Sequence, residues 1–212
     1  MTGEPIVARL PDVVPLFPLP NTVFFPYTVL PLHIFEPRYR TMVRDARDGD
    51  RLIAVALSRG ADFHPIGTVG RLRDVESLAD GRFNIRLEGV ARAVFTEVPS
   101  DRQYRLAKLE PRPERELEEQ LPEAEQVKLD LLATLGYLRS ELSESGSHPI
   151  VLDEKLPLHV AVNVVCAGLP IEPLERQALL EEDDLLVRQR SAAERIQGVI
   201  QRVPTHRGAF DA

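Results

Sequence analysis

The segment from Val14 to Tyr39 constrains the fold of this chain most, because it holds six prolines and four phenylalanines. Each proline fixes its own φ angle and removes a backbone donor. This spacing excludes a continuous helix, and it disfavours any central strand longer than a few residues. The segment is also too apolar for a solvated linker. We therefore expect short extended pieces and tight turns packed on a core, with a helix that begins only at Glu36 or Pro37.

Three further stretches of the sequence resemble motifs of a known protein family. They are IGTVG at 66–70 with Asp80-Gly81 after it, the strand-like stretch Phe83 to Phe95 with Gly89 and Arg92, and ERQALLE at 175–181. Together with the proline-rich opening, they resemble the N-terminal substrate-recognition domain of Lon proteases, from about Val14 to Val203. The resemblance implies a stand-alone, PUA-like domain that binds other polypeptides and lacks the ATPase and peptidase domains.

Length and composition favour an ordinary globular chain. The sequence has 212 residues, 43% of them hydrophobic, so it can bury a core without disulfides or metals. Cys166 is the only cysteine, which excludes an intrachain disulfide and fits a reducing compartment. The sequence predicts no signal peptide and has no apolar run of about 18 residues. We expect a cytoplasmic protein that does not associate with a membrane.

Charge divides the chain into two halves. Residues 1–110 carry a net charge of +1, and residues 111–212 carry −8. Phosphate neutralisation by cations supplies most nonspecific affinity for nucleic acids. The acidic second half therefore disfavours nucleic acid as a partner.

The hydrophobic pattern predicts an α+β fold. Residues 51–57, 66–78, 83–95 and 104–109 read as strands, and Phe83, Ile85 and Leu87 alternate with polar residues. Gly89 predicts a bulge or bend. We expect five or six strands in all, and with one or two helices, of which Glu36 to Arg47 is the clearest, they favour a small barrel-like lobe over residues 1–110.

The second half reads as about four helices in a bundle over residues 123–204. Residues 111–122 are predicted to be a solvated connector, and residues 205–212 a flexible tail. Val127 to Leu142 and Leu156 to Ala167 form the first two helices, Pro173 can open the third, and Asp183 or Asp184 can cap the last. The last helix should bury the stripe formed by Leu185, Gln189, Ala192, Ile196, Val199 and Val203.

The sequence offers no recognisable catalytic motif. Its three lysines are Lys108, Lys128 and Lys155, and none follows a glycine, so the phosphate-binding motif G-x-x-x-x-G-K is missing. The five histidines lack metal-ligand spacing, and Cys166 reads as a buried small hydrophobe. We expect no cofactor, no metal and no enzymatic activity.

The charged segments have simple structural readings. The acidic runs Glu114 to Glu119 and Glu181 to Asp184 are interpreted as solvated faces. Glu36 and Arg38 can pair across the start of the first helix, either as a capping arrangement or as a polar contact for a partner.

The candidate partner-binding residues are Phe24, Phe25, Tyr27 and Arg38. Neighbours in an extended segment point to opposite sides, so Phe24 and Phe25 cannot both face one core. One of them should lie in a surface groove or against the helical half, although burial of both between the two halves is an equal alternative. Aromatic and arginine side chains are the usual anchors of partners.

Three functions remain in view. The first is a noncatalytic module that binds unfolded or misfolded polypeptides, acts with a protease or chaperone, and is a monomer or weak homo-oligomer. The second is an enzyme or protease-associated hydrolase. The third is an RNA-binding barrel, which the matched charges of the first half disfavour.

Overall fold

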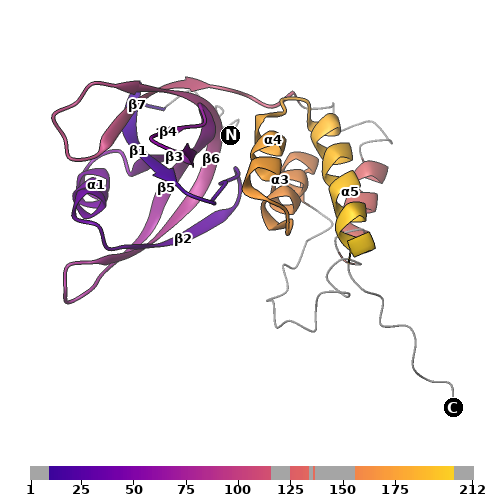
Figure 1. Cartoon of the computed structure of the whole chain (residues 1–212), viewed down its shortest axis with the longest axis horizontal. Coiled ribbons are helices and arrows are strands. Elements are labelled where there is room, and N and C mark those ends of the chain that lie inside the picture. Colours follow the sequence, from indigo (N-terminus) through magenta and orange to yellow (C-terminus); the bar gives the residue numbers. More distant parts are fainter. Residues whose placement is uncertain (1–9, 116–124, 134–135, 137–155, 203–212) are drawn as a thin grey trace, which may run out of the picture.

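The computed structural model describes residues 10–115, 125–133, 136 and 156–202 of the chain. Its named elements are β1 (Val13–Leu19), β2 (Val29–Ile34), α1 (Pro37–Asp48), β3 (Leu52–Arg59), β4 (Asp62–Phe63), β5 (Ile66–Ser77), β6 (Phe83–Val98), β7 (Arg105–Pro111), α3 (Leu158–Gly168), α4 (Pro173–Glu181) and α5 (Leu185–Arg202). The strands and α1 form one half of the molecule, and α3, α4 and α5 lie together beside them (Figure 1). The predicted order, β-rich first and helical second, is confirmed.

The seven described strands form one sheet, one or two more than the sequence suggested. The pairings run from β1 through β7, β6, β5 and β3, and β3 then pairs back with β1 in parallel. All the other pairings are antiparallel. The strand β2 pairs only with β6, and β4 only with β3. One edge of β2 is therefore unpaired within the described residues.

The prediction that the prolines would prevent a central strand of more than a few residues is wrong for β1. This strand has seven residues, including Pro15 and Pro18. Residues 13–16 pair with β7, whereas residues 16–19 pair with β3. Each half of β1 is therefore paired mainly on one side, so a proline nitrogen that faces the other side costs no ladder hydrogen bond.

Local signals place the other elements well. The helix α1 begins at Pro37 and buries Met42, Val43 and Ala46. The register of β6 against β5 shifts between Val69 and Gly70, opposite Gly89, which confirms the predicted irregularity. The side chain of Asp184 accepts hydrogen bonds from the amides of Leu186 and Val187 at 3.0 and 3.1 Å, and so caps α5.

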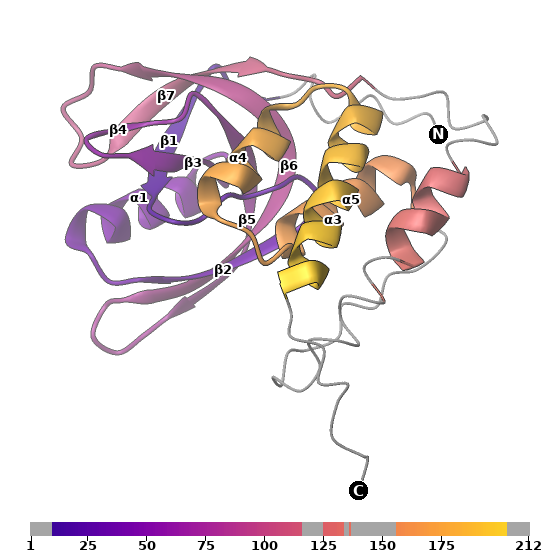
Figure 2. The same ribbon diagram turned by 45° about the vertical axis from the view of Figure 1, so that its right-hand side comes forward.

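The helical half packs against the sheet through a shared core. Val23, Phe25 and Leu57 from the first half belong to the same buried cluster as residues of α3, α4 and α5. In addition, Gln177 of α4 donates a hydrogen bond of 2.9 Å to the carbonyl of Ile66 at the start of β5. Figure 2 shows α4 lying next to the strands, with α5 on the side of α4 away from the sheet.

Several predictions fall partly outside the described residues. Residues 125–133 are helical, as expected, but the remainder of the predicted helix to Leu142 lies outside them. Most of the predicted connector and the whole of the predicted tail at 205–212 also lie outside the described residues. In the described part of the chain, no helix is long and apolar enough to cross a bilayer.

Candidate functional site

Two of the four predicted partner-binding residues, Phe24 and Phe25, are buried. Phe24 is 3% exposed and packs with α1 and the inner strand residues, whereas Phe25 is 0% exposed and packs with the helical half. The two rings thus enter different cores, as the alternation of an extended segment requires. In this structure neither ring is available to a partner.

The third residue, Tyr27, is exposed and sits in a sharp turn. Its φ angle is +62°, and its amide donates a 2.9 Å hydrogen bond to the carbonyl of Gly89. A Cβ atom at Gly89 would lie 2.3 Å from the carbonyl oxygen of Phe25, so a side chain there would displace the turn. The ring of Tyr27 lies 5.0 Å from the ring of His159 on α3, and the turn therefore bridges β6 and the helices.

The fourth residue, Arg38, lies at the start of α1. Its Nε atom donates to the Glu36 carboxylate at 3.0 Å, which confirms the predicted pair. Glu36 is the N-cap residue, but its side chain makes no capping hydrogen bond. The guanidinium of Arg38 also lies over the ring of Tyr39, 4.4 Å from its centroid. The pair is thus a surface feature at the mouth of a cavity.

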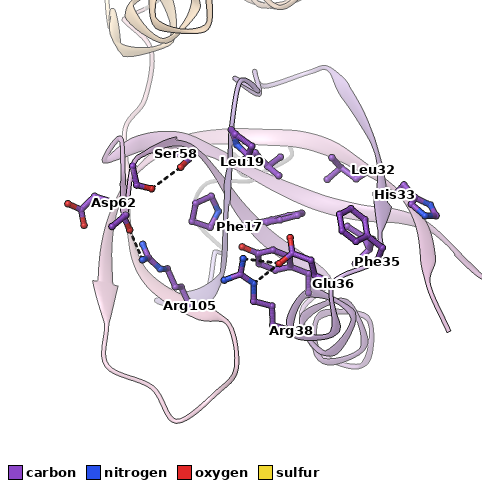
Figure 3. A pocket seen from close by; sticks show the side chains of 16 residues that line it. Phe17, Leu19, Leu32, His33, Phe35, Glu36, Arg38, Ser58, Asp62 and Arg105 are labelled. Carbon is purple, nitrogen blue, oxygen red and sulfur yellow. Dashed lines mark hydrogen bonds and ion pairs between the residues drawn. The ribbon is translucent and has the colours of Figure 1, made fainter. Parts of the chain in front are cut away.

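That cavity, which we call the β1–β2 cavity, has a volume of about 630 Å³. It lies between the end of β1, the end of β2 and the first turn of α1, where neither strand edge pairs with the other. Figure 3 shows Leu19 and Leu32 facing the opening from opposite walls, and Phe35 beside Leu32. The turn between β3 and β4 closes the remaining side.

The walls of the β1–β2 cavity combine apolar and aromatic side chains with polar ones. Phe17 forms part of the wall, and its ring packs against Tyr39 at a centroid distance of 4.3 Å. Phe35 is 61% exposed, although it is a large aromatic residue. Its ring stacks loosely on His33, 6.3 Å away. A concave surface with apolar and aromatic side chains among polar ones, and with an exposed aromatic rim, can hold an apolar side chain of a ligand.

Polar side chains line this cavity on several sides, with Ser58 and Asp62 at the β3–β4 turn and His33 on the opposite side (Figure 3). Arg38 and Arg105 lie below Phe17 in Figure 3. Arg105 donates from Nη2 to the carbonyl of Ala61 at 2.7 Å, which fixes its side chain against the β3–β4 turn. Burial raises the pKa of the Tyr39 hydroxyl, and the neighbouring guanidiniums of Arg38 and Arg105 oppose that shift. Tyr39 is therefore a neutral hydrogen-bond donor at physiological pH.

The described residues offer little for bond-breaking chemistry. Among them, no group of three or more His, Cys, Asp or Glu side chains could hold a metal ion. Ser58 lines the β1–β2 cavity, but its hydroxyl bonds to the carbonyl of Gly60 and no lysine lines the cavity beside it. Burial raises the pKa of the Cys166 thiol to about 12, so this cysteine is not a nucleophile.

A buried ionic cluster joins the two halves of the molecule. Arg92 on β6 and Arg188 on α5 both have side chains with 0% exposure, and Glu114 lies between them. Arg92 donates to the carbonyls of Leu180 and Glu182, at 2.7 and 2.9 Å, and so satisfies the end of α4. Arg188 pairs with Glu114. We call these three residues the junction cluster.

The interpretation of both acidic runs as solvated faces is wrong at Glu114 and Asp183. Glu114 is 9% exposed and also accepts a 3.0 Å hydrogen bond from Asn163 of α3. Asp183 accepts from Arg112 at 2.7 and 2.9 Å and from Arg92 at 2.9 Å. The start of the predicted connector is consequently packed at the junction. These acids neutralise arginines that folding removes from water.

A comparison with known families identifies the domain. The family model for the ATP-dependent protease La (LON) substrate-binding domain matches residues 13–197. The chain belongs to this family. The predicted resemblance to Lon N-terminal domains is therefore confirmed over nearly the whole chain.

Relatives and solved structures agree with this assignment. The chain is 28% identical to Lon protease 2 of Myxococcus xanthus over 87% of its length, and 30% identical to Lon protease of Geobacter metallireducens over 92%. It spans only 23% and 27% of these relatives, about a quarter of their length.

Two solved structures share the fold. The N-terminal domain of Mycobacterium avium complex Lon protease matches with a TM-score of 0.70 and 15% identity, over 87% of this chain and 98% of the other. The Lon N-terminal domain protein from Xanthomonas campestris matches with a TM-score of 0.60 and 23% identity, over 91% and 99%. At these identities the likeness concerns the fold alone.

Sequence reasoning missed several residues that line the β1–β2 cavity of this Lon-family domain. Phe17, Phe35 and Tyr39 were seen only as part of the proline-rich segment or of a helix face, and Arg105 was not singled out. Phe35 carried a usable signal, because it is an aromatic residue between the end of a strand and a Pro-initiated helix. Arg105 carried none, since only the folded chain brings β7 beside α1.

The Asp183 carboxylate predicts a pH dependence of stability. Hydrogen bonds from Arg112, followed by those from Arg92, lower its pKa below the ordinary 3.8. A depressed pKa in the folded state adds stability at pH values above the pKa of the unfolded state, and this stability is lost as pH falls through the pKa of the folded state.

We therefore expect Asp183→Asn to destabilise the domain at neutral pH, and the difference in stability from the unsubstituted chain to shrink below about pH 4. Urea unfolding of both chains, from neutral pH to below about pH 4, measures the difference in their free energy of unfolding. The exposed Asp101→Asn is the control, and a pH-independent difference would contradict the assignment.

Proposed function

We propose that this chain is a noncatalytic module that binds unfolded or misfolded polypeptides. Its parts would be a PUA-like barrel lobe at residues 1–110, a connector at 111–122 and a helical bundle at 123–204. Membership of a substrate-binding family supports the proposal, together with the missing phosphate-binding motif in the sequence. Clients would be presented to a protease or chaperone.

The β1–β2 cavity is the observation that carries this proposal. An extended polypeptide exposes apolar side chains that a folded protein buries, and a cavity of about 630 Å³ can take one or two of them. Phe35, which is 61% exposed at the rim, would cover such a side chain. The unpaired edge of β2 adds free backbone groups beside the cavity, which an extended segment could pair with.

The four candidate residues from the sequence analysis have different roles in the proposal. Arg38 lines the β1–β2 cavity. Tyr27 is exposed in the turn before β2, which lies next to β6 and α3. Both side chains could therefore touch a client. Phe24 and Phe25 would act indirectly, because they hold the proline-rich segment on its two cores.

A substitution at Phe35 tests the proposal. Phe35→Ala should weaken binding of reduced, unfolded casein by roughly 10- to 150-fold, because burying a phenylalanine side chain contributes about 1.5–3 kcal/mol. The matched control is Leu174→Ala, since Leu174 is 66% exposed on α4, outside the cavity. Fluorescence anisotropy with labelled casein provides the measurement. Equal loss in both variants, or no binding by the unsubstituted chain, would refute the proposed site.

A further inference from the structure

A second hollow adjoins the β1–β2 cavity and differs from it in charge. This hollow, which we call the arginine hollow, has a volume of about 600 Å³ and lies between the start of α1, the end of β6 and the loop that leads to β7. Three residues line both spaces: Arg38, Tyr39 and Arg105. A polypeptide that passes from one space to the other must therefore cross these three side chains.

The arginine hollow is basic in an acidic protein. Three arginines line it, Arg38, Arg102 and Arg105, against one carboxylate, Glu97. The chain as a whole carries a net charge of −7. Glu36 and Asp45, which are not among the lining residues, pair with Arg38 and Arg102. The lining itself still holds more cations than anions, which complements an anionic ligand.

One buried donor of an arginine that lines the arginine hollow has no partner in the described part of the protein. The Nη1 atom of Arg105 is buried and has no hydrogen-bond partner within the described residues. The other nitrogens of this guanidinium are engaged, with Ala61 at 2.7 Å and Glu97 at 3.5 Å. A buried donor without a partner costs stability, and the carboxylate of a ligand would satisfy it. The neutral Tyr39 hydroxyl adds a second donor nearby.

We propose that the arginine hollow binds the side-chain carboxylate of an acidic residue next to the apolar segment held in the β1–β2 cavity. The inference rests on the proposed function, and it defines the preferred clients as apolar segments flanked by Asp or Glu. Arginine suits a carboxylate because its planar fork can donate two parallel hydrogen bonds. A side chain is favoured over a chain terminus, because the hollow continues beyond the three shared residues and a bound chain need not end there.

Peptide pairs test this preference. A set of short fluorescein-labelled peptides carries one apolar cluster and a single Glu at successive positions beside it. Each peptide has a partner with Gln at the same position, and the C-termini are free or amidated. We expect at least one Glu peptide to bind about tenfold more tightly than its Gln partner at low salt, with the preference reduced by added salt and unchanged by amidation.

Variants of the chain locate the effect. Arg38→Gln and Arg102→Gln should each bring the Glu-to-Gln affinity ratio close to one, and both side chains are more than half exposed, so folding should survive. The control Arg86→Gln removes an exposed arginine from β6, outside both spaces, and should keep the ratio. Equal binding of Glu and Gln peptides, or dependence on a free C-terminus, would overturn the inference and leave the proposed function intact. Failure of every peptide to bind would overturn both.

Discussion

Glu114→Gln is expected to lower the free energy of unfolding by roughly 3 kcal/mol, one of the two largest effects that we predict for a single substitution in this domain. The Glu114 carboxylate accepts hydrogen bonds from Arg188 and Asn163 and lies 3.7 Å from Nε of Arg92. Both guanidiniums are fully buried, so neither can recruit water in its place.

The physical reason is the repulsion that would remain. Burial, followed by the nearby charge of Arg188, lowers the pKa of Arg92, and the carboxylates of Glu114 and Asp183 oppose this shift. Glutamine keeps one oxygen acceptor and nearly the same shape, but it removes the negative charge and replaces the second oxygen with an NH2 donor. The variant therefore removes the charge of Glu114 with little change in the volume of the side chain.

Urea unfolding at neutral pH measures the change, with Glu110→Gln as the matched control. Glu110 is an exposed acid at the end of β7, four residues before Glu114. A loss below about 1 kcal/mol at Glu114, or an equal loss in both variants, would show that the carboxylate is screened by water and that the cluster does not hold the two halves together.

The junction cluster also marks the limit of what the sequence could predict. An acidic run beside three prolines has the composition of a solvated connector, and nothing near Glu114 distinguishes it from its neighbours. Its partner Arg188 is 74 residues away and is brought to it by the contact between the residues that follow β7 and the start of α5. The role of a charged residue in this protein is therefore decided by tertiary contacts that local composition does not encode.

Features with short-range causes were predictable. The helix start at Pro37, the capping of α5 by Asp184 and the irregularity at Gly89 all follow from the chemistry of one or two residues. The burial stripe of α5 follows from helical periodicity: Leu185, Ala192 and Ile196 are buried as expected. These signals gave the α+β order and most element boundaries.

The candidate site could be predicted from the sequence only in part. Alternation predicted that Phe24 and Phe25 face opposite sides, but it could not say whether the second side was a surface groove or another core. The β1–β2 cavity combines Phe17 from β1, Phe35 after β2 and Arg105 from β7, and only the folded sheet brings these residues together. Aromatic content thus pointed to the correct segment, whereas the side chains that line a cavity depended on the sheet topology.

Phe25→Ala is expected to lower the free energy of unfolding by about 3–5 kcal/mol, the range for removal of a large buried aromatic side chain. Phe25 has no exposed surface and packs in the same cluster as Leu158, Leu179 and other helical residues. Its loss would leave a cavity in the core that the proline-rich segment shares with the helices. Because the turn after it rests on Gly89, the backbone cannot easily close that space.

The control is Tyr27→Ala, two residues away in the same turn, where the side chain is 45% exposed. We expect a loss below about 1 kcal/mol there, since little buried surface is removed. Thermal and urea unfolding of both variants gives the comparison, and client binding is measured only under conditions where each is folded. If Phe25→Ala were as stable as Tyr27→Ala but failed to bind casein, Phe25 would be a partner contact, and the shared core would not be what joins the two halves.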